Sequence, residues 1–373
     1  MRVLHIATVV TPDGAYGGPV RVAVNLCSEL AEHGWDARIA AGTWGFAAPP
    51  HSQDGVPLFL FHAWRMLPGR GFAATFSPKL LRSFGRLISR ADLVHVHLGR
   101  DLVTLPFAAL CRAARVPYVV QCHGMVVAND HPLTGILDRL VTQGVLRSAR
   151  RVFWLTEREQ VAMAELFGPD LAWQHLRNGV SLPEKQALPA LSDEVLYMAR
   201  LHPRKRPELL VDAAVTVGRR LGNMRLAVVG PDEGSAEDVQ RAAASAGAGT
   251  TISVEGPLAP ERTSARFLQA GLYVLPSIDE PFPMSALEAM SLGLPVIITD
   301  SCGLAPFVRG SDAGIVVDAS VEQLEQALES LLRDPSRRSE LGANARRLVE
   351  REFALGAVVD ELEGIYRSIL SGS

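Results

Sequence analysis

Short apolar runs alternate with helical stretches along the whole chain, and this alternation limits the fold more than any other feature. In the first half a helical pattern over Pro19–His33 follows the first apolar run, with Pro19 suited to a first turn and Gly34 to a stop. The pattern is typical of a parallel sheet with crossover helices. The apolar runs of this half are Val3–Val9, Ala37–Ala41, Leu93–His97, Tyr118–Cys122 and Val152–Leu155.

The same pattern starts again in the second half, with predicted helices over Pro207–Leu221 and Met284–Leu292. We therefore predict an α/β fold of two Rossmann-like domains, residues 1–185 and 186–352, that face each other across a cleft. A C-terminal helix, 353–373, is expected to pack back toward the N-terminal domain. Ligands of such folds bind at the carboxyl ends of the strands. The predicted strands of this half are Glu194–Ala199, Arg225–Val229, Thr251–Val254, Leu272–Leu275 and Val296–Thr299.

Composition excludes several classes of protein. The 373 residues have a net charge of −3, whereas a nucleic-acid binder usually has a basic excess, so we expect no nucleic-acid partner. No apolar run approaches the roughly 18 residues of a membrane-spanning helix. The four cysteines form no C-x-x-C pair, which indicates buried thiols in a reducing compartment and a cytoplasmic location.

The loop after the first predicted strand argues against a dinucleotide-binding enzyme. It has the sequence Gly14-Ala-Tyr-Gly17-Gly18-Pro19, which is not G-x-G-x-x-G, and no acidic residue ends the strand Ala37–Ala41. A glycine-rich loop that opens a helix can still hold an anion. The alternative, a plain tight turn, stays open.

The second half places charged residues where predicted strands end. Glu280 follows one strand, and Glu288 lies on a helix that begins near Pro283. The start of that helix offers N–H groups and a positive dipole end to a phosphate. Arg200 at a strand end and Lys205 at a helix start together suit a diphosphate, since arginine presents a forked donor and lysine a point charge. Lys205 and Glu280 are both expected to lie in exposed loops at strand ends.

With these motifs in this order, the sequence resembles family 4 of the retaining glycosyltransferases, which have the GT-B fold and use nucleotide sugars. The resemblance covers nearly the whole chain. The stretches that support it are Gly17-Gly18, Asp92-Leu-Val-His95-Val-His97, His123-Gly124, Asn178-Gly179-Val180, the Arg200/Lys205 pair, Gly256 and the Glu280/Glu288 pair.

The resemblance implies a role for each matching residue. Arg200 and Lys205 would hold the donor diphosphate, Glu280 would accept bonds from the donor sugar and Glu288 from the ribose. His123 would lie near the reacting sugar, while the role of His97, in the site or in the core, is left open. The implied catalytic set is His123, Glu280, Arg200 and Lys205; the implied donor-binding set is Gly17, Gly18, Arg200, Lys205, Gly256, Glu280, Phe282, Met284, Ser285 and Glu288.

The implied reaction moves a hexosyl group from a nucleoside diphosphate sugar to a hydroxyl acceptor, with anomeric retention. The setting would be exopolysaccharide, glycolipid or glycosylated natural-product synthesis. Because no Asp-x-Asp cluster stands at a strand end, we expect no metal and no other cofactor, and the cations would stabilise the leaving diphosphate instead. One departure from the family is Pro283 in place of the usual glycine, which removes a backbone N–H. A GT-B epimerase, a phosphorylase or a non-catalytic sugar-nucleotide binding protein remains the alternative.

Residues 78–90 suggest a surface role. The first half, residues 1–188, has a charge of +5 and the second −8. In this segment an apolar helical stripe stands opposite basic residues, a pattern that can lie in a lipid interface. This would allow peripheral contact with the inner face of a membrane and a lipid-linked acceptor. The alternative is that the stripe packs on the first sheet and the acceptor is a small molecule. The apolar residues are Leu80, Leu81, Phe84, Leu87 and Ile88, and the basic ones are Lys79, Arg82, Arg86 and Arg90.

Overall fold

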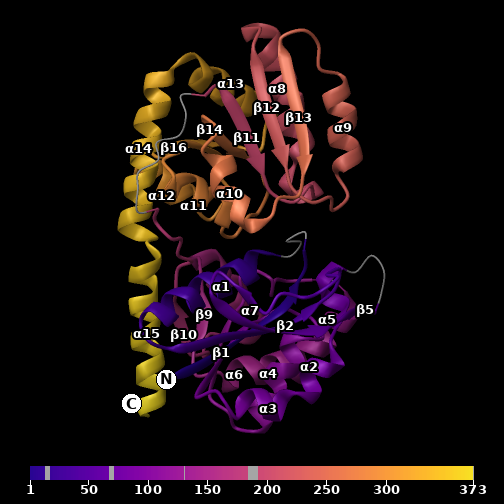
Figure 1. Ribbon diagram of the computed structural model, residues 1–373, viewed down its shortest axis with the longest axis vertical. Helices are drawn as coiled ribbons and strands as arrows, with labels where there is room; N and C mark the ends of the chain where they lie inside the picture. Colours follow the sequence, from indigo (N-terminus) through magenta and orange to yellow (C-terminus); the bar gives the residue numbers. More distant parts are fainter. Residues whose placement is uncertain (13–16, 67–70, 130, 184–191, 373) are drawn as a thin grey trace. The chain divides into compact units, whose positions relative to one another are not determined.

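The computed structural model describes residues 1–12, 17–66, 71–129, 131–183 and 192–372, which form two compact units (Figure 1). The first unit takes in the described residues up to Gly179 together with the segment from Leu355 onward, and the second spans Val180–Ala354. The boundary set from the sequence, after residue 185, falls just beyond this division. Within the part of the chain that the structure describes, no helix is long and apolar enough to cross a bilayer.

The first unit is built on an eight-stranded sheet with the strand order β10-β9-β8-β7-β1-β2-β4-β3. All its pairs are parallel except β3 with β4. A separate antiparallel pair joins β5 and β6. The strands are β1 Arg2–Val10, β2 Asp36–Thr43, β3 Ser52–Gln53, β4 Val56–His62, β5 Trp64–Arg65, β6 Thr75–Phe76, β7 Leu93–His97, β8 Tyr118–Gln121, β9 Val152–Trp154 and β10 Trp173–His175.

The helices of this unit connect parallel strands, as crossover segments must. In α1, Val20, Val24, Cys27 and Leu30 recur at helical spacing and are buried. The helices are α1 Gly17–Glu32, α2 Pro78–Arg82, α3 Phe84–Ile88, α4 Thr104–Ala113, α5 Pro132–Leu137, α6 Gln143–Ser148, α7 Glu157–Phe167 and α15 Leu355–Ser371, with a 3₁₀ turn at Gly71–Ala74 and a π-helical turn at Asp138–Thr142.

The second unit is built on a six-stranded parallel sheet with the order β13-β12-β11-β14-β15-β16. The prediction of two Rossmann-like halves is thereby confirmed. The elements are β11 Glu194–Met198, a 3₁₀ turn Pro203–Lys205, α8 Pro207–Leu221, β12 Met224–Val229, α9 Ala236–Ala244, β13 Thr250–Gly256, α10 Pro260–Phe267, β14 Leu272–Leu275, α11 Met284–Ser291, β15 Val296–Thr299, α12 Ala305–Gly310, β16 Gly314–Val317, α13 Val321–Arg333 and α14 Pro335–Glu352.

Each sheet has a point where the direction of strand progression reverses. In the first unit β1 lies between β2 and β7, and in the second β11 lies between β12 and β14. Loops that leave such neighbouring strands go to opposite faces of the sheet, which opens a crevice at the carboxyl ends of the strands. The best-placed ligand sites are therefore at the ends of β1 and β7 and at the ends of β11 and β14.

The last helix, α15, is part of the first unit, where it lies beside α1 (Figure 1). A Cβ atom on Gly179 would lie 2.8 Å from the Cα of Leu355, so only glycine admits this approach. Further along the helix, Tyr366 is fully buried, and its ring centroid lies 5.6 Å from that of Trp35.

Residues 78–90 form two short helices, α2 and α3, rather than one amphipathic helix. Ser83 ends the first and begins the second, in keeping with the preference of serine for helix caps. Leu80 and Leu87 are buried, while Leu81, Phe84 and Ile88 are partly buried against the same core. The apolar stripe therefore packs on the sheet, which is the alternative given in the sequence analysis, and membrane contact by this segment stays a prediction.

Candidate active site

The predicted cations of the second unit follow β11, and Glu280 follows β14, so all of them lie beside the crevice of that sheet. The loop between β14 and α11 is held in place by backbone bonds. Ile278 donates its N–H to the carbonyl of Arg204 at 2.9 Å, and Gly303 donates to the carbonyl of Glu280 at 2.9 Å. Asp279 has φ 49°, a left-handed conformation that aspartate tolerates better than most residues.

Lys205 and Glu280 form a buried ion pair at this edge. The Nζ of Lys205 donates to the Oε2 of Glu280, and each residue is only 8% exposed. Arg204 adds a second cation, with Nη2 3.9 Å from the same oxygen. Burial lowers the pKa of Lys205, and the charge of Glu280 opposes this. The expectation from sequence that both residues are exposed is therefore wrong.

Arg200 is paired as well, with a residue that sequence analysis did not single out. Its Nη1 donates to Glu233 Oε2 at 2.6 Å, and Glu233 lies in the loop after β12. The Arg200 carbonyl accepts a bond of 2.8 Å from the Tyr197 hydroxyl, which fixes the backbone at the end of β11. Both cations of the predicted diphosphate clamp are thus oriented by carboxylates before any ligand arrives.

The helix α11 begins at Met284, as the sequence predicted, and Pro283 is its N-cap. The N–H that Pro283 lacks is therefore the one at the N-cap position, before the first residue of the helix. Ser285 lies 2.7 Å from the Tyr273 hydroxyl through its Oγ. Glu288 is half-buried one turn further on.

Two more predicted donor-binding residues have other surroundings. Phe282 is 7% exposed, and its ring meets that of Phe353 edge-on with centroids 5.6 Å apart, so it is part of the core of the unit. Gly256 ends β13 with φ +69° and has open space where a Cβ would lie. Its carbonyl accepts a 2.9 Å bond from the N–H of Gly230, at the end of the neighbouring strand β12.

In the first unit the predicted residues lie after β1 and after β8. Gly17 and Gly18 open α1, and Gly18 has open space around its Cα. Its N–H is one of the first four of the helix, which lack intrahelical partners. His123 is half-buried beyond the end of β8, with φ 52°.

His123 is joined to a row of buried imidazoles. Its Nε2 lies 2.7 Å from Nδ1 of His97, whose Nε2 lies 3.0 Å from Nδ1 of His5. The Tyr366 hydroxyl lies 3.4 Å from Nε2 of His5 and 2.6 Å from Nδ1 of His95. Burial lowers the pKa of His5 and of His123 to about 3, and that of His95 and His97 well below its usual range. The row is therefore uncharged at neutral pH.

Glu159, which sequence analysis missed, fixes the turn after His123. Its Oε1 accepts from the N–H of Gly124 at 2.6 Å, and its Oε2 accepts from the N–H of Leu155 at 2.7 Å. Burial raises the pKa of this carboxyl, and the two backbone bonds oppose that shift. The Thr156-x-x-Glu159 spacing at the start of α7 is the sequence signal, since it matches a capping box.

Two groups of three side chains in the described part of the chain have ligand atoms close enough for a metal ion. In the first, His5, His95 and His97, the rings of the last two stack 4.6 Å apart at 5°. Their nitrogen lone pairs therefore run parallel instead of converging. In the second, His33 and Arg367 already donate to the Glu363 carboxylate.

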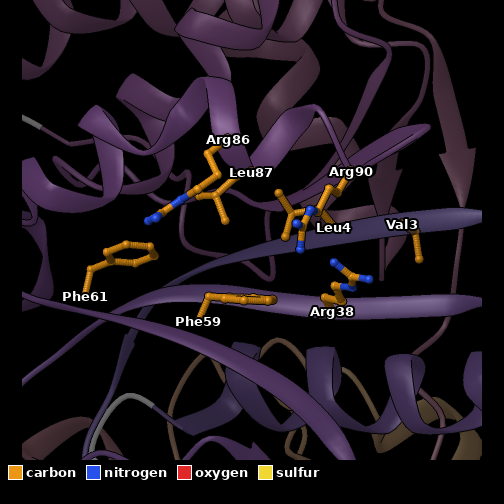
Figure 2. A pocket seen from close by; sticks show the side chains of 8 residues that line it. All are labelled: Val3, Leu4, Arg38, Phe59, Phe61, Arg86, Leu87 and Arg90. Carbon is orange, nitrogen blue, oxygen red and sulfur yellow. The ribbon is translucent and has the colours of Figure 1, made fainter.

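The first unit also has a pocket of about 370 Å³ between its sheet and α3 (Figure 2). Its apolar wall includes Phe59 and Phe61 of β4, and its polar residues are three arginines, Arg38, Arg86 and Arg90. Arg38 is bonded to Asp36 at 2.6 Å through Nε, while the lining itself includes no acidic residue.

Comparison with known families agrees with this division. Residues 17–179 match the family described as glycosyl transferase 4-like domain, and residues 181–348 match glycosyl transferases group 1. The two matches meet where the compact units divide, at Gly179 and Val180. The chain belongs to the group 1 glycosyltransferases of the GT-B fold, and the resemblance seen in the sequence is confirmed.

Individual relatives are similar over most of their length. The alpha-D-kanosaminyltransferase of Streptomyces kanamyceticus is 26% identical over 305 residues, which cover 74% of this chain and 77% of the relative. A D-inositol 3-phosphate glycosyltransferase of Kineococcus radiotolerans is 26% identical over 98% of this chain and 93% of its own. The crystal structure of HepE from Anabaena in complex with UDP-glucose has a TM-score of 0.75 at 18% identity, over 99% of this chain and 100% of that one. This chain is therefore a glycosyltransferase.

Proposed function

We propose that this glycosyltransferase moves a hexosyl group from a nucleoside diphosphate sugar to a hydroxyl acceptor with retention of the anomeric configuration. The observation that supports the donor site is the set of preoriented cations beside the β11–β14 crevice. Arg200 and Lys205 are each held by a carboxylate, Glu233 and Glu280. The similarity to HepE, whose crystal structure contains UDP-glucose, makes a uridine donor the first to test.

Arg200 and Lys205 would act mainly on the leaving diphosphate. As the glycosidic bond to the diphosphate breaks, negative charge builds up on the phosphate oxygens. A buried lysine and an arginine oriented in advance stabilise that charge without reorganisation, an effect worth about 2.7–4 kcal/mol for one donor. We propose that these cations and the N–H groups of α11 take the place of a metal ion.

Glu280 would act on the sugar as well as on Lys205. One oxygen, Oε2, contacts Lys205, so Oε1 remains the better placed to accept from a sugar hydroxyl. Ser285 and Glu288 follow on the first turns of α11, the latter placed to accept from a ribose. Phe282 would support this loop from the core rather than contact the donor.

His123 would contact a hydroxyl of the substrate in the first unit. Because burial lowers its pKa to about 3, the imidazole is neutral at physiological pH and is a weak base. It is therefore suited to orient a hydroxyl by hydrogen bonding and not to remove its proton. We propose that the proton of the acceptor goes to the departing phosphate, on the face of the sugar that the phosphate leaves.

The test is a donor screen by mass spectrometry with UDP, GDP, ADP and dTDP sugars, against soluble and lipid-linked acceptors, with and without a chelator. We expect transfer with one donor class, full activity in EDTA, and a product whose anomeric configuration by NMR equals that of the donor. The Lys205→Ala variant is the matched blank. Hydrolysis or epimerisation without an acceptor would point to a non-transferase, binding without turnover to a binding protein, and loss in EDTA restored by Mg²⁺ to a metal-dependent enzyme.

We also propose that α2 and α3 contact an anionic lipid surface through charge alone, near an acceptor linked to lipid. Since the apolar stripe is turned to the core, lipid insertion is not available to it. Arg86 and Arg90 are exposed, and together with Arg38 they surround the pocket in Figure 2. Guanidinium groups gathered without a carboxylate in the lining attract an anion. The contact would be weak and sensitive to salt.

A further inference from the structure

The loop between β7 and α4, residues 98–103, links the crevice of the first unit to the antiparallel pair of β5 and β6, here called the β5–β6 ribbon. Asp101 in this loop accepts a 2.8 Å bond from the hydroxyl of Thr8, near the end of β1. The next residue, Leu102, pairs with Phe76 of β6 in an isolated bridge. The ribbon is therefore fastened to the edge of the sheet at which the crevice lies.

An apolar row crosses this ribbon. Trp64 of β5 pairs directly with Phe76, which in turn pairs with Leu102, and directly paired residues have their side chains on the same face. Met66, two residues beyond Trp64, shares that face because side chains alternate along a strand. Phe76 is half-buried, whereas Trp64 is 46%, Met66 56% and Leu102 38% exposed.

A second group of exposed apolar residues lies on the other side of the same loop. Arg100 donates to the Asp138 carboxylate through Nε at 2.9 Å and through Nη2 at 2.7 Å. Its Nη1 donates to the carbonyl of Val127, so Val127 and the start of the π-helical turn are both held against the loop. Val127 is 51% exposed, and Ile136 and Leu140, which lie on either side of Asp138, are 55% and 71% exposed.

Together the two groups form a surface that we name the apolar border. In the described part of the chain it holds six of the thirteen large apolar side chains that are exposed. Figure 1 shows β5 and α5 on the same side of the first unit. Single exposed apolar residues are ordinary, but a gathering of them marks contact with an apolar ligand or partner. The apolar border consists of Trp64, Met66, Leu102, Val127, Ile136 and Leu140.

Two arginines of these segments are engaged elsewhere. Arg65 follows Trp64 and therefore points to the opposite face of the ribbon, where its guanidinium lies 4.9 Å from the ring centroid of Trp44. The side chain of Arg100 is 12% exposed and is paired with Asp138. Neither arginine therefore presents its charge along the apolar border.

The apolar border begins close to the crevice. Val127 follows His123 by four residues. Four residues span at most about 14 Å even when the backbone is fully extended. A molecule whose hydroxyl contacts His123 can therefore reach the apolar border with a tail of modest length.

We propose that the apolar border binds the alkyl chain of an amphiphilic acceptor whose hydroxyl end lies in the crevice beside His123. The inference rests on the proposed transfer to a hydroxyl, and it names the acceptor class as a hydroxyl-bearing amphiphile bound one molecule at a time. A chain suits this surface because it can follow an apolar row that crosses several backbone segments. Since apolar burial grows with chain length, each added methylene should strengthen binding by about two- to fourfold.

Fluorine NMR of the full-length enzyme labelled with 5-fluorotryptophan tests this contact without turnover. The chain has five tryptophans, and Trp64→Phe assigns the resonance of Trp64. The probes are hexyl, octyl and decyl β-D-glucoside below their micelle concentrations, with methyl β-D-glucoside as the blank. We expect a saturable shift of the Trp64 resonance with the three alkyl glucosides only, and a Kd that falls by about two- to fourfold for each methylene. No shift, or a Kd independent of chain length, would overturn the proposal.

Two double variants locate the contact. Leu102→Ser with Leu140→Ser removes apolar surface from both groups and should raise the Kd for octyl β-D-glucoside by about tenfold. Val161→Ser with Leu166→Ser, at exposed positions of α7, is the matched control and should leave this Kd unchanged. Because all four side chains are exposed, the melting temperatures should change little. Equal Kd values in the two double variants would contradict the proposal.

Other occupants of the apolar border would give different results. A second copy of the chain would appear in analytical ultracentrifugation as a dimer that Leu102→Ser with Leu140→Ser converts to a monomer. A bilayer would shift the Trp64 resonance with neutral vesicles but not with monomeric octyl β-D-glucoside. Either result overturns the proposal. Lys205→Ala should lose transfer yet bind octyl β-D-glucoside normally, so the failure of this inference and that of the proposed function are distinguishable.

Discussion

The two sheets present different chemistry at equivalent edges. Beside β1 and β7 the first unit has neutral imidazoles, whereas beside β11 and β14 the second has two ion pairs, an almost fully buried one between Lys205 and Glu280 and a partly exposed one between Arg200 and Glu233. Both positions are reversal points of a parallel sheet, so the backbone frame is the same and the side chains alone differ. Neutral acceptors suit sugar hydroxyls, and preoriented cations suit a diphosphate. The comparison shows how one architecture used twice can serve two halves of a reaction.

The largest effect should come from breaking an ion pair in the second unit. Lys205→Ala should lower kcat/KM by about 10²–10³-fold, since a donor to the developing charge is lost. It should also lower the free energy of unfolding by about 3–5 kcal/mol, because the buried Glu280 carboxylate is left unpaired. Urea unfolding and steady-state kinetics measure the two effects.

A double variant separates these effects. Lys205→Met with Glu280→Leu removes both charges, so stability should recover to near the natural level while transfer stays lost. Arg220→Ala, which breaks an exposed pair with Glu325 and Glu329, is the surface control and should change the urea midpoint little. Normal turnover by Lys205→Ala would remove this lysine from the donor site.

In the first unit a comparable effect is expected from Glu159→Gln. The Glu159 carboxylate accepts one hydrogen bond from the N–H of Gly124 and one from the N–H of Leu155. Glutamine turns its NH₂ donor toward one of these N–H groups, so one of the two hydrogen bonds is lost. We expect a loss of about 1–3 kcal/mol in unfolding free energy and a fall in kcat, because the turn after His123 loosens. Glu165→Gln, exposed on the same helix, provides the comparison. Equal stability of the two variants would argue against a bracing role for Glu159.

Acid should act on the first unit before the second. Burial lowers the pKa of His5 and His123 to about 3 and that of His95 and His97 well below its usual range, whereas a histidine in the unfolded chain has a pKa of about 6.5. Below pH 6.5 the unfolded chain therefore binds more protons than the folded one, and stability falls as pH falls. Each imidazole should contribute about 1.4 kcal/mol per pH unit, and His97→Asn should reduce the slope by that amount.

Hydrogen exchange read by mass spectrometry can assign this acid sensitivity to a unit. Between pH 7 and 5, once intrinsic exchange rates are corrected, protection should fall first in β1 and β7 and later in β11 and β14. Equal loss in both sheets would show that the ion pairs are as sensitive as the imidazoles.

The smallest effect concerns the surface of the first unit. Arg86→Gln with Arg90→Gln should weaken co-sedimentation with anionic vesicles by about 1 kcal/mol for each charge, with transfer to a soluble acceptor unchanged. Arg219→Gln with Arg241→Gln, in the second unit, is the matched pair. Equal recovery in the supernatant with anionic and neutral vesicles at low salt would leave a soluble acceptor as the better proposal.

The fold was largely predictable because its central strands are continuous apolar runs. Leu93–His97, Leu272–Leu275 and Val296–Thr299 were predicted with the bounds that they have, as was the helix Pro207–Leu221. The strand Val56–His62 was not predicted, since it is half-exposed and includes Pro57. This strand, β4, is next to the last in its sheet, and it lacks the uniform burial that makes a central strand visible in sequence.

The candidate site was predictable as a set of positions but not as a set of pairs. Arg200, Lys205, Glu280 and His123 stand out because they follow strands. Their partners lie far away in the sequence. Glu280, for example, contacts Lys205 although 75 positions separate them. Burial is likewise hidden, which is why Lys205 and Glu280 were expected to be exposed. The contacts of Glu159, and those that join His5, His97 and His123, form only when the strands of the first sheet are paired.

The place of α15 has a consequence for the order in which the protein is made. The first unit includes the last helix of this sequence, and Tyr366 joins His5 to His95 in its interior. A ribosome therefore releases the strands β1 to β10 long before the residue that links these imidazoles has been translated. Domains generally fold during synthesis from the N-terminus onward. The second unit can therefore complete its fold while the first unit still lacks α15. A chain that stops before Tyr366 would keep every strand of both sheets yet lack the hydroxyl that lies between His5 and His95, so completion of the first unit waits for the synthesis of α15.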